Sequence, residues 1–379
     1  MSKNKNLLFG GVAVIAVLCV VVALTVNWKG EKDEGLIKIG VVLPLTGTLS
    51  RMGEMERDAM ILAAEELVAG GFSQVKLFFE DNQSKSPMAV TAVNKLIDID
   101  KVDLVITSTT GASLAVQPIL EEREVLQFAF CMDTDIASQS PNTIRYYMGL
   151  EQEISTILKY ISDNNIKRVG VLCCKIPAYE TLVNKYIDPY FARTQDKLLV
   201  YREFYELNQL DFRSQILKLK DAGIDCLILL GYGFEYHNIY KIIDEQKMLN
   251  TFEVIGGWGF LYTEISPGFL ENTLVAGPEY TFENNKNTLE FKSKFYAKFG
   301  YSPNFDAAFA YESIIHLPDI WNKNRNKNGK VNYKEFFSKF RVADGICGSY
   351  HFDQDGNMVL EKTGLGIFKN GELTNLYQQ

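Results

Sequence analysis

The sequence has few of the residues that build metal sites and many catalytic sites. Only three histidines, His237, His316 and His351, occur among 379 residues, and they lie far apart. The six cysteines form no CxxC pair, so neither a zinc site nor a disulfide framework is indicated. G-x-S-x-G and P-loop spacings are also missing. We therefore expect a protein that binds without chemistry, with no cofactor and no metal.

The sequence also lacks a strongly basic segment. It has 39 Lys and Arg against 47 Asp and Glu, which gives a net charge of −8. An acidic chain without a basic patch is unsuited to nucleic acid or to an anionic lipid surface. The length of 379 residues exceeds one ordinary hydrophobic core and predicts two lobes.

The N-terminus contains a long apolar run. Lys3 and Lys5 precede 20 uncharged residues, 7–26, and Lys29 follows. Twenty helical residues cross a hydrocarbon core of about 30 Å. Residues 1–30 are therefore predicted to be a signal or anchor segment with one membrane-length helix. The basic leader predicts that the rest lies outside the cytoplasm, in the periplasm or at the cell surface. An uncleaved anchor that tethers the protein to the membrane, a cleaved signal peptide and a lipoprotein signal ending at Cys19 all remain open.

The rest of the chain alternates between apolar strand patterns and amphipathic helix patterns. In the first such unit, strand 37–43 passes through a Pro44–Gly47 loop into a helix that ends near Gly70. The other predicted strands are 75–80, 103–107, 126–130, 168–173, 198–204, 226–231 and 252–256. Strands separated by helices imply crossover connections and parallel sheets. We predict an α/β fold of two Rossmann-like lobes, with ligands bound at the carboxyl ends of the strands.

Six motifs in order resemble one family. They are IGVVLPLTG at 39–47, TGASLA at 110–115, Pro177-Ala178-Tyr179, Asp211-Phe212, FGYSPNFDAAFAYES at 299–313 and GSYHFDQDG at 348–356. From about residue 37 onward the chain resembles the type I periplasmic binding proteins, specifically the branched-chain amino-acid (Leu/Ile/Val) binding proteins of ABC transporters.

This resemblance implies a domain organisation and partners. Two lobes with parallel central sheets would be joined by a three-crossing hinge, with residues 36–150 plus 281–345 in lobe 1 and 151–280 plus 346–379 in lobe 2. The implied function is an extracytoplasmic, monomeric substrate-binding protein that delivers an amino acid-like ligand to ABC permease subunits. A ligand-sensing module that reports to a membrane receptor is the alternative.

The resemblance also implies a set of ligand-binding residues. Thr109 and Thr110 would bind the α-carboxylate at a helix start, although threonine there is also an ordinary N-cap. Cys131 would offer its carbonyl group to the ligand ammonium, and Asp133 stands where the family has a hydroxyl residue. Because Trp258 stands where an acidic residue is usual, we expect Asp133 to replace the missing carboxylate. Its alternative role is to cap a turn.

The remaining predicted contacts are pocket walls. Tyr179 matches a family tyrosine that closes over the ligand, Tyr232 follows a strand, and Met52 stands where an aromatic residue is usual. Aromatic walls with one acid would suit an amine through cation–π contact, and would equally suit a flat aromatic side chain. Branched-chain specificity is therefore not predicted.

Overall fold

The computed structural model describes residues 36–72, 75–231, 233–262, 265–282, 285–324 and 332–377. The chain divides into two units, 1–36 and 37–379. The predicted signal or anchor segment, residues 1–30, lies outside the described residues. Within the described ranges, no helix combines the length and the apolar character needed to cross a membrane.

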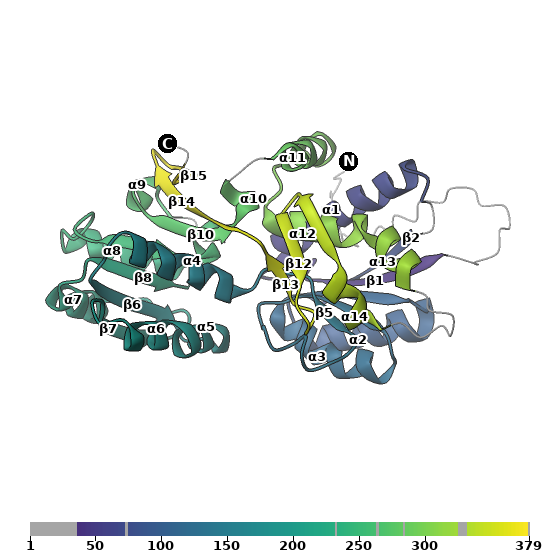
Figure 1. Cartoon of the computed structure of the whole chain (residues 1–379), viewed down its shortest axis with the longest axis horizontal. Coiled ribbons are helices and arrows are strands. Elements are labelled where there is room, and N and C mark those ends of the chain that lie inside the picture. Colours follow the sequence, from purple (N-terminus) through teal and green to yellow (C-terminus); the bar gives the residue numbers. More distant parts are fainter. Residues whose placement is uncertain are drawn as a thin grey trace, which may run out of the picture. The chain divides into compact units, whose positions relative to one another are not determined.

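The first lobe is built on a five-stranded sheet with the order β2-β1-β3-β4-β5. All four neighbouring pairs are parallel, as predicted. Buried β-branched and aromatic side chains line β1, β3 and β4, because helices cover both faces of a sheet of this kind (Figure 1). The elements are β1 (Ile37–Leu43), α1 (Ser50–Ala69), β2 (Val75–Asp81), α2 (Ser86–Lys95), β3 (Leu104–Ser108), α3 (Thr110–Glu122), β4 (Leu126–Phe130) and β5 (Thr143–Arg145).

The second lobe is built on a seven-stranded sheet with the order β15-β14-β10-β9-β8-β6-β7. The neighbouring strands β10, β9, β8, β6 and β7 are parallel to one another. Strands β14 and β15 are added at one edge in antiparallel orientation (Figure 1). The elements are α4 (Leu150–Asp163), β6 (Arg168–Cys174), α5 (Pro177–Leu182), α6 (Asp188–Arg193), β7 (Leu198–Tyr205), α7 (Arg213–Ala222), β8 (Cys226–Leu230), α8 (Phe234–Glu245), β9 (Glu253–Gly256), a 3₁₀ segment (Trp258–Tyr262), α9 (Pro267–Leu270), β10 (Leu274–Pro278), β14 (Thr363–Lys369) and β15 (Glu372–Asn375).

A two-residue turn joins β14 and β15. Lys369 pairs with Glu372 across it, and both central residues have positive φ, 53° at Asn370 and 83° at Gly371. Two positive φ angles are the signature of a type I′ hairpin turn, for which Asn-Gly is the favoured sequence.

The C-terminal helices and a small sheet complete the first lobe. These elements are α11 (Lys286–Phe299), α12 (Phe305–Ile315), α13 (Leu317–Asn324), α14 (Tyr333–Lys339), β11 (Arg341–Gly345), β12 (Gly348–Phe352) and β13 (Met358–Leu360). The short helix α10 (Glu279–Phe282) precedes them and packs against both lobes, with Tyr280 in the core of the first and Phe282 in the core of the second. Phe337, Tyr350 and Met358 share one buried cluster with Ile39 and Phe128 of the first sheet. Sequence analysis assigned all of 346–379 to the second lobe. In the structure β12 and β13 pack in the first lobe, because their apolar side chains complete its core, and β14 and β15 join the second sheet.

Arg145 connects two of the segments that pass between the lobes. Its backbone N–H donates to the carbonyl oxygen of Gly356 at 2.9 Å, and its Nε donates to Oδ1 of Asn357 at 2.7 Å. Its Nη2 lies 3.4 Å from a carboxylate oxygen of Glu151, near the start of α4. The Arg145 side chain is fully buried. Arg145 therefore connects two segments. One is the chain that leaves β5 and enters α4 of the second lobe, and the other is the turn at 356–357, which precedes the return of the chain to the second lobe.

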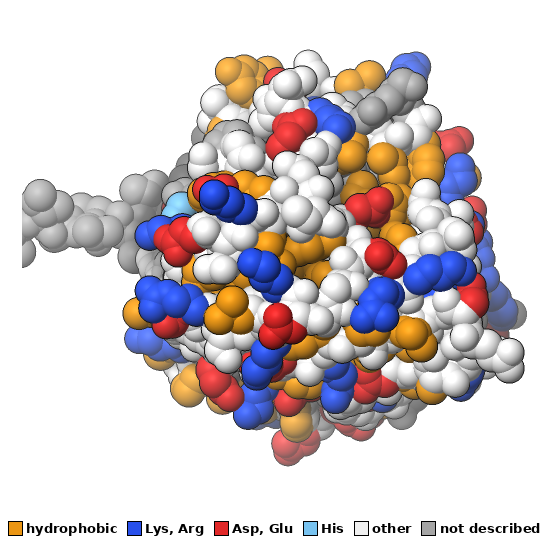
Figure 2. Space-filling model, turned by 90° about the vertical axis from the view of Figure 1, so that its left-hand side faces the viewer, with side chains coloured by type: hydrophobic (Ala, Val, Ile, Leu, Met, Phe, Trp, Pro, Cys, Tyr) orange, Lys and Arg blue, Asp and Glu red, His pale blue; other side chains and the backbone are white. Residues whose placement is uncertain are grey.

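The surface of the second lobe carries charges of both signs. Figure 2 shows Lys and Arg side chains interspersed with Asp and Glu on the face that it presents. The ion pairs Lys175–Glu206 and Lys218–Glu203 are part of this pattern. Mixed signs do not create the extended positive field that nucleic acid requires.

Candidate ligand-binding site

The turn after β3 has an unusual backbone conformation. Thr109 has φ 79° and ψ 144°, a region that β-branched residues rarely occupy. Its Oγ1 accepts the N–H of Ala112 at 3.4 Å, so Thr109 is the N-cap of α3. The hydroxyl oxygen of Thr110 accepts the N–H of Met132 at 3.2 Å, which joins this turn to the loop after β4. A strained residue at the carboxyl edge of a parallel sheet is a reason to look for function there.

The loop after β4 is held by local hydrogen bonds. Cys131 is buried, and its sulfur accepts the N–H of Asp133 at 3.3 Å. Burial raises the pKa of the Cys131 thiol to about 11, so the group is a neutral thiol. Asp133 is half-buried, and its Oδ1 accepts the N–H of Asp135 at 2.8 Å. Asp133 therefore caps the turn, which was its alternative role. Its other carboxylate oxygen, Oδ2, does not take part in this cap.

Two contacts join the loop after β4 to the second lobe. Met132 packs against the core of the second lobe. Asp135 forms an ion pair with Lys185 at 3.5 Å. The predicted ligand-binding loop of the first lobe thus faces the second lobe.

The predicted wall residues differ in their surroundings. Tyr179 is buried in the core of the second lobe, and its hydroxyl donates to the carbonyl oxygen of Gly231 at 3.4 Å. Burial raises the pKa of Tyr179 well above its usual value, so it is a neutral donor. Met52 is half-buried near the start of α1. Tyr232 lies outside the described residues.

Trp258 lies at the junction of the two lobes. Its side chain is half-buried and packs against the cores of both lobes. Its backbone N–H donates to Oε1 of Glu153 at 3.1 Å. A Cβ atom on Gly257 would stand 2.2 Å from Oε2 of Glu153, so glycine permits this close approach. Glu153 is 2% exposed, and loss of hydration raises its pKa well above the usual value.

Sequence analysis did not select Glu153. It lies on the buried face of α4 with Ile154, Ile157 and Ile161. A carboxylate within the apolar stripe of a helix is rare, because burial of a charge is costly. The signal available in the sequence was the helical spacing of Glu153, four residues before Ile157 and eight before Ile161.

A second buried acidic group lies beside the turn after β3. Glu56 and Asp306 are each 1% exposed. Oε1 of Glu56 accepts the hydroxyl of Ser108, the last residue of β3, at 2.9 Å. Loss of hydration, and then the charge of Asp306, raise the pKa of Glu56 well above the usual value. Asp306 stands between Phe305 and Ala307 in sequence, whereas Glu56 lies in a charged stretch, residues 54–58. Sequence analysis selected neither residue.

Asp306 is surrounded by neutral donors. Its Oδ1 accepts the hydroxyl of Tyr147 at 2.9 Å, and its Oδ2 accepts Nδ2 of Asn304 at 2.9 Å. Tyr262, from the second lobe's 3₁₀ segment, also donates its hydroxyl to Oδ2. In the part of the chain that the structure describes, no group of three or more His, Cys, Asp or Glu has a metal-binding arrangement.

A model of the periplasmic binding protein family matches residues 36–341. The chain belongs to this family. Leu/Ile/Val-binding protein homolog 2 of Brucella abortus (strain 2308) is 25% identical over 382 residues, with 97% of each chain covered. The family comprises solute-binding proteins rather than enzymes, and membership implies a location outside the cytoplasm, as the sequence predicted.

Solved structures of similar fold carry different ligands. A branched-chain amino acid transporter substrate-binding protein from Streptococcus pneumoniae, in complex with isoleucine, superimposes with a TM-score of 0.70 at 22% identity, covering 89% of this chain and 97% of that one. A solute-binding protein of an ABC transporter from Rhodopseudomonas palustris BisB5, in complex with 3,4-dihydroxybenzoic acid, gives a TM-score of 0.74 at 19% identity, covering 90% and 95%. At these identities the similarity establishes the type I periplasmic binding fold and leaves the ligand open.

Proposed function

We propose that this protein is the solute-binding component of an ABC importer that captures an amino acid or a related small amine-bearing ligand between its lobes. The observation that carries the proposal is the position of Trp258, which packs against the cores of both lobes. Closure of the lobes around a ligand would exclude water and give the permease a distinct surface to recognise. We further propose that the protein acts as a monomer, tethered to the membrane if residues 1–30 are retained.

Two observations support an amine-bearing ligand over a purely anionic one. The curated relative is named for Leu, Ile and Val, and one neighbour of the same fold holds isoleucine. Buried carboxyl groups gather near the junction, namely Glu56, Asp306 and Glu153. An aromatic acid, the ligand class of the other neighbour, carries no ammonium that could pair with these groups.

A thermal-shift screen tests the ligand class. The protein from residue 31 onward would be heated with each of the amino acids, polyamines, amides and small aromatic acids, including 3,4-dihydroxybenzoate. A ligand present at about 100 times its Kd adds about 2.7 kcal/mol to the free energy of unfolding. We expect stabilisation by one or more amine-bearing compounds. Stabilisation by the small aromatic acids alone would overturn the proposed ligand class.

Thr110 is predicted to bind the ligand carboxylate. We expect Thr110→Ala to weaken binding by about 1–3 kcal/mol, because a buried anion would lose a hydroxyl donor. Isothermal calorimetry with the best ligand of the screen measures this loss. Thr91→Ala removes an exposed hydroxyl from α2 and is the matched control. Equal affinities of Thr110→Ala and wild type would exclude the carboxylate role.

Asp133 is predicted to supply the counter-charge for the ligand's α-ammonium. Asp133→Asn keeps the oxygen that accepts the N–H of Asp135 and removes the charge. We expect binding of zwitterionic amino acids to fall by roughly tenfold or more, the usual value of a hydrogen bond to a charged group. Asp221→Asn, at an exposed position on α7, is the control. Calorimetry that finds both variants equal to wild type would leave Asp133 with its turn-capping role alone.

A further inference from the structure

We propose that Glu56 and Asp306 form an anionic subsite that receives a cationic group of the ligand. The proposal rests on the solute-binding function proposed above and names the chemistry that the ligand must carry, an organic ammonium. Neither residue belongs to the set of contacts that sequence analysis predicted.

The pair lies where the predicted site of the first lobe meets the second lobe. Glu56 is on α1, which packs against α12, the helix of Asp306. The hydroxyl that binds Glu56 belongs to Ser108, which directly precedes Thr109 and the start of α3. A hydroxyl that binds Asp306 belongs to Tyr262, in the same short 3₁₀ segment of the second lobe as Trp258. The subsite is therefore bounded by both lobes.

The pair lacks a compensating positive charge among the described residues. Oε2 of Glu56 is buried and has no hydrogen-bond partner there. The donors to Asp306 are all neutral, namely Tyr147, Tyr262 and Asn304. Two neighbouring buried carboxyl groups cannot both ionise cheaply without a cation, and burial raises the pKa of each. A ligand ammonium would supply the missing charge and bind the free oxygen of Glu56.

The surroundings also suit an organic cation. The Trp258 and Tyr262 rings meet edge to face with centroids 5.2 Å apart, and the Tyr262 and Phe305 rings do so at 6.0 Å. Aromatic faces next to carboxylates attract ammonium groups through their quadrupoles. A purely structural role would not require charge here, since a well-packed apolar pair of similar volume is usually at least as stable.

A different buried carboxyl group provides a matched control. Glu312 is also 1% exposed in the first lobe, but it accepts the backbone N–H of Ile346, between β11 and β12. Burial raises its pKa to about 7. Glu312→Gln thus makes the same chemical change at a comparable depth, away from the Trp258 segment.

The experiment measures selectivity, which a general loss of stability would not change. Kd values of the full chain are measured by calorimetry for two pairs of compounds that differ by one ammonium group. L-leucine is compared with 4-methylpentanoate, and L-lysine with L-norleucine. The four proteins are wild type, Glu56→Gln, Asp306→Asn and Glu312→Gln, and thermal unfolding verifies that each is folded.

The leucine pair, whose single ammonium is assigned to Asp133, should keep its preference in all four proteins. We expect wild type and Glu312→Gln to prefer L-lysine to L-norleucine by roughly tenfold or more. Glu56→Gln and Asp306→Asn should bring that preference to within about twofold in the same pair. Retained preference in both variants would overturn the proposal while leaving the solute-binding function intact. A wild type that binds the compounds without preferring the ammonium would also overturn it. A wild type that is stabilised by none of the screened amine-bearing compounds would instead contradict the proposed function.

Discussion

Replacing Phe337 with alanine should lower the free energy of unfolding by about 3–5 kcal/mol, the usual cost of removing a fully buried aromatic side chain. Phe337 is on α14 and is fully buried. Its ring packs against Phe128 of β4 at 5.7 Å between centroids and against Phe352 of β12 at 4.8 Å. It thus joins the first sheet to the small C-terminal sheet. Alanine would leave a cavity that these separate elements cannot easily fill.

Urea denaturation monitored by circular dichroism measures this effect. Tyr296→Ala is the control, because this aromatic side chain is 58% exposed on α11 and its loss should change stability by less than about 0.5 kcal/mol. If both variants lost the same small amount, β12 would not be packed against the first lobe in solution.

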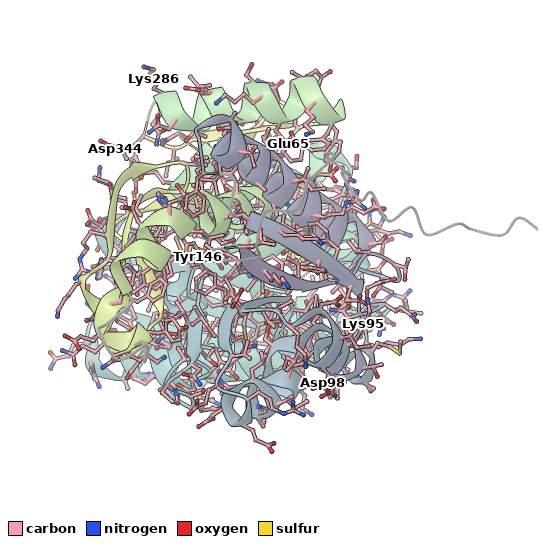
Figure 3. The ribbon with its side chains drawn as sticks, turned by 90° about the vertical axis from the view of Figure 1, so that its right-hand side faces the viewer. Glu65, Lys95, Asp98, Tyr146, Lys286 and Asp344 are labelled. Carbon is pink, nitrogen blue, oxygen red and sulfur yellow. The ribbon has the colours of Figure 1, made fainter. Side chains whose placement is uncertain are left out.

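The stability of the protein should also depend on the protonation of Glu312. Burial raises its pKa from 4.5 to about 7, with backbone and side-chain hydrogen bonds offsetting part of that shift. The surrounding cluster is aromatic, with Tyr146 bound to Tyr350 through their hydroxyls at 2.6 Å. Tyr146 lies in the interior of the lobe, whereas Glu65, Lys95 and Asp344 extend from its periphery (Figure 3). A carboxylate in such surroundings is poorly hydrated and favours its protonated form.

The direction of the pH effect follows from the raised pKa. Between pH 4.5 and about 7 the folded protein retains the Glu312 proton that the unfolded chain has lost. The stabilisation linked to this proton is fully present below pH 4.5, decreases as the pH rises and is lost above about 7. A shift of this size corresponds to roughly 3 kcal/mol.

Glu312→Gln separates this group from others that titrate nearby. The half-buried His316, whose pKa is lowered to about 4 by loss of hydration, acts in the opposite direction over part of the same range. The informative quantity is therefore the difference in stability between variant and wild type, measured at pH 5 and at pH 8. We expect this difference to shift in favour of the variant by roughly 2–3 kcal/mol over that interval. Parallel pH profiles for the two proteins would contradict the prediction, and Glu121→Gln at an exposed position provides the control.

Local patterns in the sequence were sufficient to predict the parallel sheets, and a local pattern also accounts for the β14–β15 turn. The run IKIGVVL has the β-branched composition of a buried strand, and Asn370-Gly371 has the conformational freedom of a type I′ turn. Both depend on neighbours within a few residues. The order of motifs from 39 to 356 was sufficient to predict the family, which the match over 36–341 confirmed.

The candidate site was only partly predictable. Thr109 and Thr110 follow a strand and open a helix, so their position at the sheet edge is a local consequence of the fold. The buried acids are not local, because Glu56 and Asp306 are separated by 250 positions and come together only when α1 packs against α12. The N-terminal segment and Tyr232 lie outside the described residues, and the predictions for them stand untested.

The sequence alone determined the class of fold, the family and the position of the turns that follow β3 and β4. Periodicity and turn chemistry act over short stretches of chain, so these features can be recognised locally. Only the tertiary structure decided that β12 and β13 complete the first lobe while β14 joins the second sheet, and that Glu153 lies beneath Trp258. Those outcomes depend on which apolar surfaces pack together and which charges they bury. Such choices are made between distant segments, and no local pattern encodes them.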